Sequence, residues 1–194
     1  MESKKAKEVR ETMFLKFDAS KRKYMKLSFE EMKRLARKIS RTILAEYGRP
    51  GSIVYIERGG MVFARMLSDF LSVKELHGIN ASYYTDIGTP SRMVNVGSAE
   101  IGFGGRGYVL VADDIADTGK TLHTVLKKLS ESTDNRLVSA TLVFKPASIL
   151  VPDVYGKKVS NETWVVFDYE ENETVQSFRR NKNDNGLLFM KKSF

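Results

Sequence analysis

The sequence contains no cysteine, only two histidines and only four prolines among its 194 residues. The lack of cysteine excludes disulfide bonds, thiolate metal sites and a cysteine nucleophile. The two histidines, His77 and His123, have no ligand-type neighbour at metal-binding spacing. No run without a charged residue is longer than Leu76–Thr85, far short of the roughly 18 apolar residues of a membrane-spanning helix. The N-terminal residues also lack the apolar core of a signal peptide, so we expect a cytoplasmic protein with no membrane partner.

The net charge of +8 comes from the beginning of the chain. Residues 1–41 contain 14 lysines and arginines against six aspartates and glutamates, whereas the rest of the chain carries equal numbers of the two kinds. Such a basic segment can contact nucleic acid, an acidic protein surface or only solvent. We favour contact with solvent because lysine-rich leading segments are common, and we do not expect nucleic acid as a partner.

The order of helical and strand-like patterns is that of an α/β protein. Ser28 and Glu31 form a capping box before a helical apolar pattern that ends at Gly48. Helical patterns also cover Met61–Leu71 and Thr118–Leu129. Strand-like runs cover Ser52–Ile56, Ile79–Tyr84, Tyr108–Ala112, Leu137–Phe144 and Thr163–Phe167. The alternation predicts a mainly parallel twisted sheet flanked by helices.

The expected organisation is one principal domain with a segment at either end. We expect a basic leader at 1–27, the domain at 28–178 and a tail at 179–194. Between Asp86 and Gly107 the chain contains five glycines and one proline. A segment of this length without a clear pattern is typical of a mobile or functional loop, which we place at about 86–107.

Two glycine patterns resemble nucleotide-binding motifs but stand in the wrong context. The glycines within 102–107 spell G-x-G-x-x-G, which binds dinucleotides where it follows a strand and opens a helix. Here the pattern precedes the strand-like run Tyr108–Ala112. The triplet at 119–121 resembles the end of a P-loop, but Asp114 occupies the position of the required first glycine. We reject both interpretations.

The most informative segment is Val109–Leu122, with the sequence VLVADDIADTGKTL. An apolar strand ends in two adjacent carboxylates, Asp113 and Asp114, and a turn with several hydroxyl groups then opens a helix. In open α/β sheets, ligands bind beyond the carboxyl ends of the strands. Backbone N–H groups at 116–121 are suited to a phosphate dianion. Carboxylates beside that anion require ribose hydroxyls or a divalent cation between them.

This segment resembles the phosphoribosyl-pyrophosphate (PRPP) signature of type I phosphoribosyltransferases, in which a hydrophobic run and two acids precede D-T-G-x-T. The resemblance implies that Asp113 and Asp114 hold the ribose hydroxyls. It implies that the 5′-phosphate is bound by Ala116, Asp117, Thr118, Gly119, Lys120 and Thr121. Asp117 is also the residue that 6-oxopurine members of the family carry here, where it faces N7 of the purine as the proposed general acid or base.

Two segments earlier in the chain resemble other parts of this family. The run IVYIERGG at Ile53–Gly60 resembles the pyrophosphate loop, with Arg58 and Gly59 as its binding residues. The resemblance further implies a cis peptide bond between Glu57 and Arg58. Ser82 and Tyr83 stand where the mobile catalytic loop of the family begins. This loop would exclude water from the reacting centre.

The residues that the resemblance assigns to the purine base come from a small hood at about 145–178. Lys145 directly follows the strand-like run Leu137–Phe144 and would hydrogen-bond the purine O6. Trp164, the only tryptophan, would stack on the base, and the backbone of Val165 would face its N1/N2 edge. Core packing is the alternative for Trp164.

The chain departs from the pattern of its nearest relatives at Phe167-Asp168-Tyr169-Glu170. Either Asp168 or Glu170 is a candidate for the late acidic residue near Mg²⁺ and pyrophosphate, and the sequence does not choose between them. The resemblance implies that Asp114 and these two candidates, Asp168 and Glu170, supply the metal ligands.

The resemblance therefore implies a Mg²⁺-dependent enzyme of purine salvage, a homodimer or homotetramer. It would transfer 5-phosphoribosyl from PRPP to N9 of guanine, hypoxanthine or xanthine, giving a nucleoside monophosphate and pyrophosphate. One alternative is a PRPP- or nucleotide-sensing regulator of the same fold that binds nucleic acid through its basic leader. Another is an enzyme for adenine or orotate. Asp117, Arg58-Gly59-Gly60 and Lys145 together argue against the sensor, which needs neither a proton-transfer group nor a pyrophosphate clamp. Asp117 and Lys145 argue against adenine and orotate as substrates.

Overall fold

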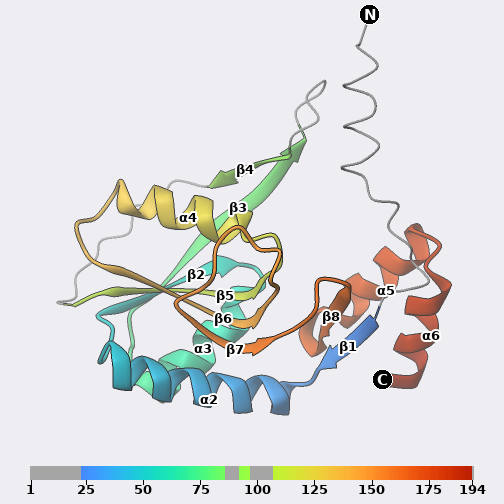
Figure 1. Cartoon of the computed structure of the whole chain (residues 1–194), viewed down its shortest axis with the longest axis horizontal. Coiled ribbons are helices and arrows are strands. Elements are labelled where there is room, and N and C mark those ends of the chain that lie inside the picture. The colour runs from blue at the N-terminus through green and yellow to red at the C-terminus, as the bar shows by residue number, and fades with distance from the viewer. Residues whose placement is uncertain (1–22, 86–91, 97–106, 194) are drawn as a thin grey trace, which may run out of the picture. The chain divides into compact units, whose positions relative to one another are not determined.

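The computed structural model describes residues 23–85, 92–96 and 107–193 (Figure 1). The chain divides into two compact units, and each is described by itself below. The larger unit is 28–161, and the smaller one combines the residues up to Leu27 with those from Glu162 onward. No helix within the described ranges is long and apolar enough to cross a membrane.

The larger unit is built on a six-stranded sheet with the strand order β4-β3-β2-β5-β6-β7. The pairs β2–β3, β2–β5, β5–β6 and β6–β7 are parallel, whereas β3 and β4 are antiparallel. The bounds are β2 Ser52–Glu57, β3 Leu76–Thr85, β4 Arg92–Val96, β5 Val109–Ala116, β6 Leu137–Phe144 and β7 Val154–Lys158. The predicted, mainly parallel sheet is confirmed.

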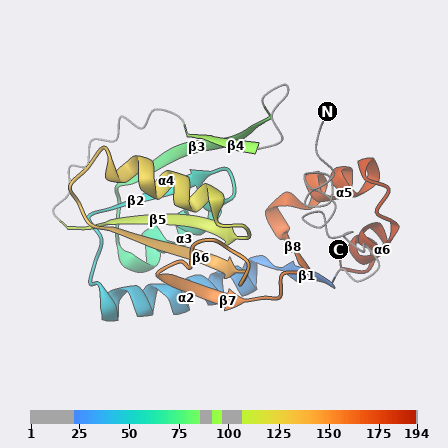
Figure 2. The ribbon, with the colours of Figure 1, turned by 45° about the horizontal axis from the view of Figure 1, so that its top comes forward.

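Helices cover both faces of this sheet, as Figures 1 and 2 show. The helices α2 (Phe29–Glu46) and α3 (Gly60–Leu71) pack together on one face, and α4 (Lys120–Ser130) lies on the other. Val54 and Val111 of the central strands share a core cluster with Leu122 and Val125 of α4. Strands buried on both faces carry largely apolar runs, which explains why β5 and β6 were evident from the sequence.

The start of α2 follows the predicted capping box only in part. Ser28 is the N-cap, and its Oγ accepts a hydrogen bond from the Glu31 amide at 3.2 Å. The Glu31 carboxylate does not complete the box but accepts two hydrogen bonds from the Arg34 guanidinium, at 2.7 and 2.8 Å. This i,i+3 ion pair holds the pKa of Glu31 below its ordinary value.

The strand β4 lies inside the segment for which the sequence predicted a loop, so that prediction was too broad. It pairs with the end of β3, where Ser82 lies opposite Asn95 and Tyr83 opposite Val94. The sequence did not reveal this strand because Arg92–Val96 does not alternate cleanly, with Met93 and Val94 both apolar, and glycines surround it. The rest of the predicted loop, at 86–91 and 97–106, lies outside the described residues.

The smaller unit joins segments from the two ends of the chain. The strand β1 (Lys23–Leu27) pairs in parallel with β8 (Thr163–Phe167), and η2 (Asp168–Glu170), α5 (Glu171–Arg180) and α6 (Asp184–Ser193) follow. Its core contains Val166, Phe178 and Met190. The expected leader thus contributes a strand and the expected tail a helix. The expected hood, 145–178, spans both units, because the division falls after Asn161.

Candidate active site

A pocket of about 370 Å³ lies where β5 ends and α4 begins. It is lined by Asp113, Asp114, Ile115, Asp117, Thr118, Gly119, Thr121 and Leu122. Six of these eight residues are ones that the sequence assigned to ribose and phosphate. The structure therefore gathers most of the predicted PRPP residues around one cavity at the carboxyl end of the sheet, where α/β proteins bind ligands.

Two adjacent carboxylates form a buried, charged part of this pocket. Asp113 and Asp114 are 8% and 9% exposed, and the Asp114 amide donates a hydrogen bond to Asp113 Oδ1 at 3.0 Å. Burial, with a smaller contribution from the negative charge of Asp114, raises the pKa of Asp113 well above its ordinary value. A pair of desolvated like charges favours a ligand that brings hydroxyl donors or a cation.

The turn at the start of α4 has the backbone of an anion-binding loop. Gly119 is the N-cap and has a φ of +73°, a left-handed conformation that favours glycine. The Lys120 amide donates to Thr118 Oγ1 at 3.4 Å, and Asp117 and Thr118 are both exposed. Because α4 starts at Lys120, the N–H groups of its first turn open at the pocket, which suits a phosphate group.

The sheet register brings the predicted pyrophosphate loop to the same carboxylates. Parallel pairing of β2 with β5, with Tyr55 opposite Ala112, places the loop after β2 beside Asp114. A Cβ atom added to Gly59 would collide with the Asp114 carboxylate. The peptide bond between Glu57 and Arg58 is cis, as the resemblance implied. Arg58, whose side chain is exposed, thus belongs to a loop that contacts the carboxylate of Asp114, one of the two predicted ribose ligands.

Lys145 reaches the same site from the neighbouring strand. Parallel pairing of Ala116 with Phe144 sets Lys145 next to Asp117, and the Lys145 amide donates to the Ala116 carbonyl at 3.0 Å. The Lys145 Nζ atom lies 3.0 Å from Asp117 Oδ1, with 9% of the lysine side chain and 60% of the aspartate side chain exposed. A nearly buried cation is therefore paired with a carboxylate that remains open to a ligand.

Two other expected base-contacting residues lie in the smaller unit. Trp164, in β8, is half-buried and its ring lies 5.4 Å from that of Phe178, in an edge arrangement. Val165 is buried and pairs with Met25 of β1. The packing of Trp164 on Phe178 agrees with a core role for at least part of the indole, which was the alternative noted from the sequence.

The two candidates for the late acidic residue also lie in the smaller unit. The Asp168 carboxylate forms an ion pair with Lys26 at 3.3 Å. Glu170 accepts a hydrogen bond from the Phe167 amide at 3.3 Å. Within the described ranges, no three carboxylate or histidine side chains are grouped so that they could hold a metal ion. Ser82 and Tyr83, the expected start of the lid, lie in β3, and their side chains are outside the described residues.

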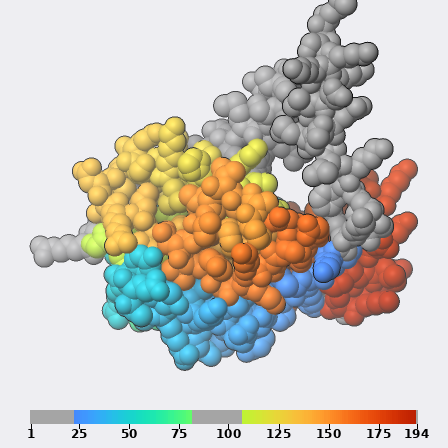
Figure 3. Space-filling model, in the orientation of Figure 1, coloured from blue at the N-terminus to red at the C-terminus, as the bar shows by residue number. Residues whose placement is uncertain are grey.

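Sequence reasoning missed the turn after Lys145, which packs against the phosphate loop. In Figure 3 the orange surface of this segment adjoins the yellow surface of α4. The Ile149 amide donates to the Thr118 carbonyl at 2.9 Å. The run Pro146-Ala147-Ser148 is a turn signal, but nothing in the sequence shows which loop the turn would contact.

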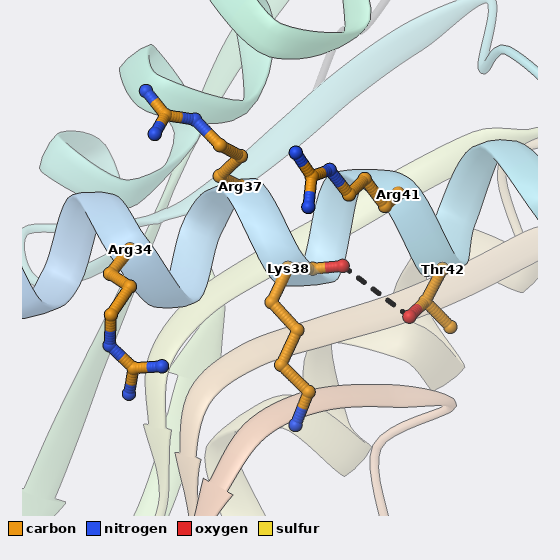
Figure 4. A pocket seen from close by; sticks show the side chains of 5 residues that line it. All are labelled: Arg34, Arg37, Lys38, Arg41 and Thr42. Atoms are coloured by element: carbon orange, nitrogen blue, oxygen red, sulfur yellow. Dashed lines mark hydrogen bonds between the residues drawn. The ribbon is translucent and has the colours of Figure 1, made fainter.

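A second pocket, of about 430 Å³, is lined by Arg34, Arg37, Lys38, Arg41 and Thr42 of α2 (Figure 4). Its cationic groups do not converge on one point, because Arg37 and Arg41 point to one side of α2 and Arg34 and Lys38 to the other. Lys38 donates to a backbone carbonyl at 3.2 Å, and the Arg37 guanidinium lies 5.2 Å from the centre of an aromatic ring. This face lacks the geometry of a specific anion site.

Comparison with known proteins shows the family of the chain. The family model of the phosphoribosyl transferase domain matches residues 24–174. A xanthine-guanine phosphoribosyltransferase of Nitratidesulfovibrio vulgaris is 31% identical over 150 residues, which cover 77% of this chain and 86% of the relative.

Solved structures give the same result. The xanthine-guanine-hypoxanthine phosphoribosyltransferase of Helicobacter pylori superimposes with a TM-score of 0.69 at 25% identity, covering 79% of this chain and 99% of that one. A purine phosphoribosyltransferase of Pyrococcus horikoshii superimposes with a TM-score of 0.64 at 26% identity, covering 75% and 93%. This chain belongs to the phosphoribosyltransferase family.

Proposed function

We propose that the protein is a purine salvage enzyme that transfers the 5-phosphoribosyl group of PRPP to N9 of guanine, hypoxanthine or xanthine. The observation that carries the proposal is the pairing of Lys145 with Asp117 beside a phosphate-type turn. An ammonium group donates hydrogen bonds and accepts none, so Lys145 suits the carbonyl O6 of an oxopurine and not the amino group of adenine. A partly exposed carboxylate beside it suits a proton at N7 of the same ring.

PRPP fits the pocket with its 5′-phosphate at the turn and its ribose at the two acids. The N–H groups of 116–121 and the hydroxyls of Thr118 and Thr121 would hold the phosphate. The 2′- and 3′-hydroxyls would donate hydrogen bonds to Asp113 and Asp114. These bonds would replace the hydrogen bonds to water that the two carboxylates lost on folding.

The donor set at this pocket fits Mg²⁺ as an ion shared with the substrate. Magnesium is commonly held by one or two carboxylates together with phosphate oxygens. Asp113 and Asp114 are adjacent, desolvated carboxylates of this kind, and Asp114 would be the protein ligand nearest the pyrophosphate loop. Bound there with PRPP, Mg²⁺ would neutralise charge on the leaving pyrophosphate. Asp168 or Glu170 remains a proposed further acid near the ion.

The reaction then divides among the loop of Arg58, Asp117 and Lys145. N9 of the base forms a bond to C1 of the ribose as the C1–pyrophosphate bond breaks, and the electron pair leaves with pyrophosphate. Arg58 and the backbone of Gly59 would hold that leaving group. Asp117 would hold or take the proton at N7, and Lys145 would stabilise charge at O6.

The remaining assignments rest on the family resemblance. We propose that Trp164 stacks on the base, that Val165 faces its N1/N2 edge and that Ser82 and Tyr83 begin a closing lid. We further propose a cytoplasmic homodimer or homotetramer.

The test is a PRPP- and Mg²⁺-dependent assay with hypoxanthine, guanine, xanthine, adenine and orotate in parallel. Formation of nucleoside monophosphate and pyrophosphate from an oxopurine, with adenine and orotate far slower, is expected. Turnover of adenine or orotate alone would contradict the assignment of Lys145. Binding of PRPP without turnover of any base would contradict the enzyme and favour a PRPP-sensing protein.

A further inference from the structure

The turn at 145–150 holds the phosphate loop on both sides of Asp117. The Lys145 amide donates to the Ala116 carbonyl at 3.0 Å, and the Ile149 amide donates to the Thr118 carbonyl at 2.9 Å. The main chain of Asp117 is therefore fixed from the same turn that carries its side-chain partner.

Ser148 closes this turn through its backbone and its side chain. Its amide donates to the Lys145 carbonyl at 3.0 Å. Its hydroxyl donates to the Leu150 carbonyl at 2.6 Å and accepts from the Leu150 amide at 3.4 Å. Leu150 is half-buried against the core cluster beneath α4, whereas Ile149 and Val151 are each 62% exposed. The Ser148 hydroxyl therefore ties the turn to Leu150, whose side chain is anchored in the core.

The phosphate loop rests directly on Ser148. A Cβ atom added to Gly119 would collide with Ser148 Oγ and would lie 3.1 Å from the Leu150 amide nitrogen and 3.2 Å from that of Ile149. Gly119 is the N-cap of α4, so its position sets where the N–H groups of the first turn point. A shift of Ser148 would move the groups that face a phosphate.

We propose that Ser148 is a positioning residue for PRPP, acting through Gly119 and the phosphate loop. The proposal deepens the proposed function and rests on it. Ser148 does not line the pocket. It fixes the turn against which Gly119 packs, and this turn determines the positions of the phosphate loop and Lys145 relative to each other. Loss of its hydroxyl loosens the loop without removing a ligand-contacting group.

The test compares Ser148→Ala with the wild-type protein and with Ser130→Ala. Ser130 is a matched control because its hydroxyl also donates to a backbone carbonyl, at 2.7 Å, but at the exposed far end of α4. We expect the Kd for PRPP, measured by calorimetry with Mg²⁺, to rise about 3- to 10-fold in Ser148→Ala, the effect of one or two hydrogen bonds. The KM for PRPP should rise equally, with kcat at saturating PRPP changed by less than about twofold.

A second variant, Ser148→Cys, keeps the shape of the side chain but replaces the hydroxyl with a larger, weakly hydrogen-bonding thiol. Thermal unfolding shows whether each variant is folded. An unchanged Kd for PRPP in a folded Ser148 variant, or an equal rise in Ser130→Ala, would overturn the positioning role while wild-type turnover leaves the proposed function intact. PRPP binding without turnover in the wild type would overturn the proposed function, and the Kd values would still decide the role of Ser148. A wild type that fails to bind PRPP overturns both.

Discussion

The contact between Gly60 and the central strand β5 predicts a cost for one added methyl group. A Cβ atom at Gly60 would lie 2.6 Å from the Ala112 carbonyl oxygen and 3.2 Å from Asp113 Cα. The obstacle is backbone of a strand paired on both sides, so it cannot turn away as a side chain would. Overpacking of this kind costs about 1–3 kcal/mol. Alanine gains up to about 1 kcal/mol over glycine inside a helix, and less in the first turn.

Gly60→Ala is therefore expected to lower the free energy of unfolding by about 1–2 kcal/mol in urea denaturation, the middle of the range that these two effects allow. It should also raise the KM for PRPP, because the pyrophosphate loop and the ribose carboxylates meet at Gly59 and Asp114. Gly48→Ala is the control: Gly48 has a φ of +76° and nothing within 4 Å of an added Cβ.

Alanine at Gly48 should cost about 1–2 kcal/mol through its left-handed backbone, with the KM for PRPP unchanged. A Gly60→Ala protein as stable as the wild type would refute the reasoning from the close contact. Equal effects of both variants on the KM for PRPP would refute the argument that a change at Gly60, the first residue of α3, acts on the pocket through Gly59 and Asp114.

Three further substitutions test the pocket itself. Burial and Asp114 raise the pKa of Asp113, so the wild-type protein loses stability as pH rises from 3.8 through the raised value. Urea denaturation at several pH values should show Asp113→Asn to be more stable than wild type at neutral pH and no more stable below pH 3.8. A difference in unfolding free energy that does not change with pH would contradict a raised pKa of Asp113 as the cause. Asp117→Asn should lower kcat by about 10²–10⁴-fold with a small change in the Kd for PRPP, and an unchanged kcat would remove Asp117 from the chemistry. Lys145→Ala should weaken the preference for oxopurines over adenine in competition assays, and an unaltered preference would rule out its contact with O6.

The larger unit was predictable because its strands are buried on both faces. The run before Asp113 is continuous and apolar, and the run before Lys145 is interrupted only by the buried residues Ser139 and Thr141. Such runs are typical of a parallel strand under two helical layers. Chemistry-bearing residues directly after such strands must meet at one edge of the sheet. That rule, with the family resemblance, placed the carboxylates, the loop of Arg58 and Lys145 at one site before the structure was known.

Contacts between distant segments were not predictable in the same way. The pairing of β1 with β8 joins a segment that looked like a charged leader to a strand about 140 residues later, and local patterns contain no information on such a partner. The Glu31 carboxylate had two local uses, a capping box or the pair with Arg34, and the sequence alone does not rank them. Ser148 lay in an ordinary turn whose contact with Gly119 depends on tertiary packing.

The pairing of Asp117 with Lys145 follows from the register between two neighbouring strands. Asp113 lies opposite Thr141, and Ala116 lies opposite Phe144, so the residues that follow these strands come side by side. Both faces of β6 are buried, so a shift of one residue would move each of its side chains into the opposite helical layer and disturb the close packing there. The buried core therefore fixes the distance between the proposed proton-handling carboxylate and the proposed O6 donor. Substitutions in the core that loosen this register are expected to weaken base selectivity and to raise the Kd for PRPP together, because Lys145 and the turn at Ser148 that holds Gly119 both follow β6.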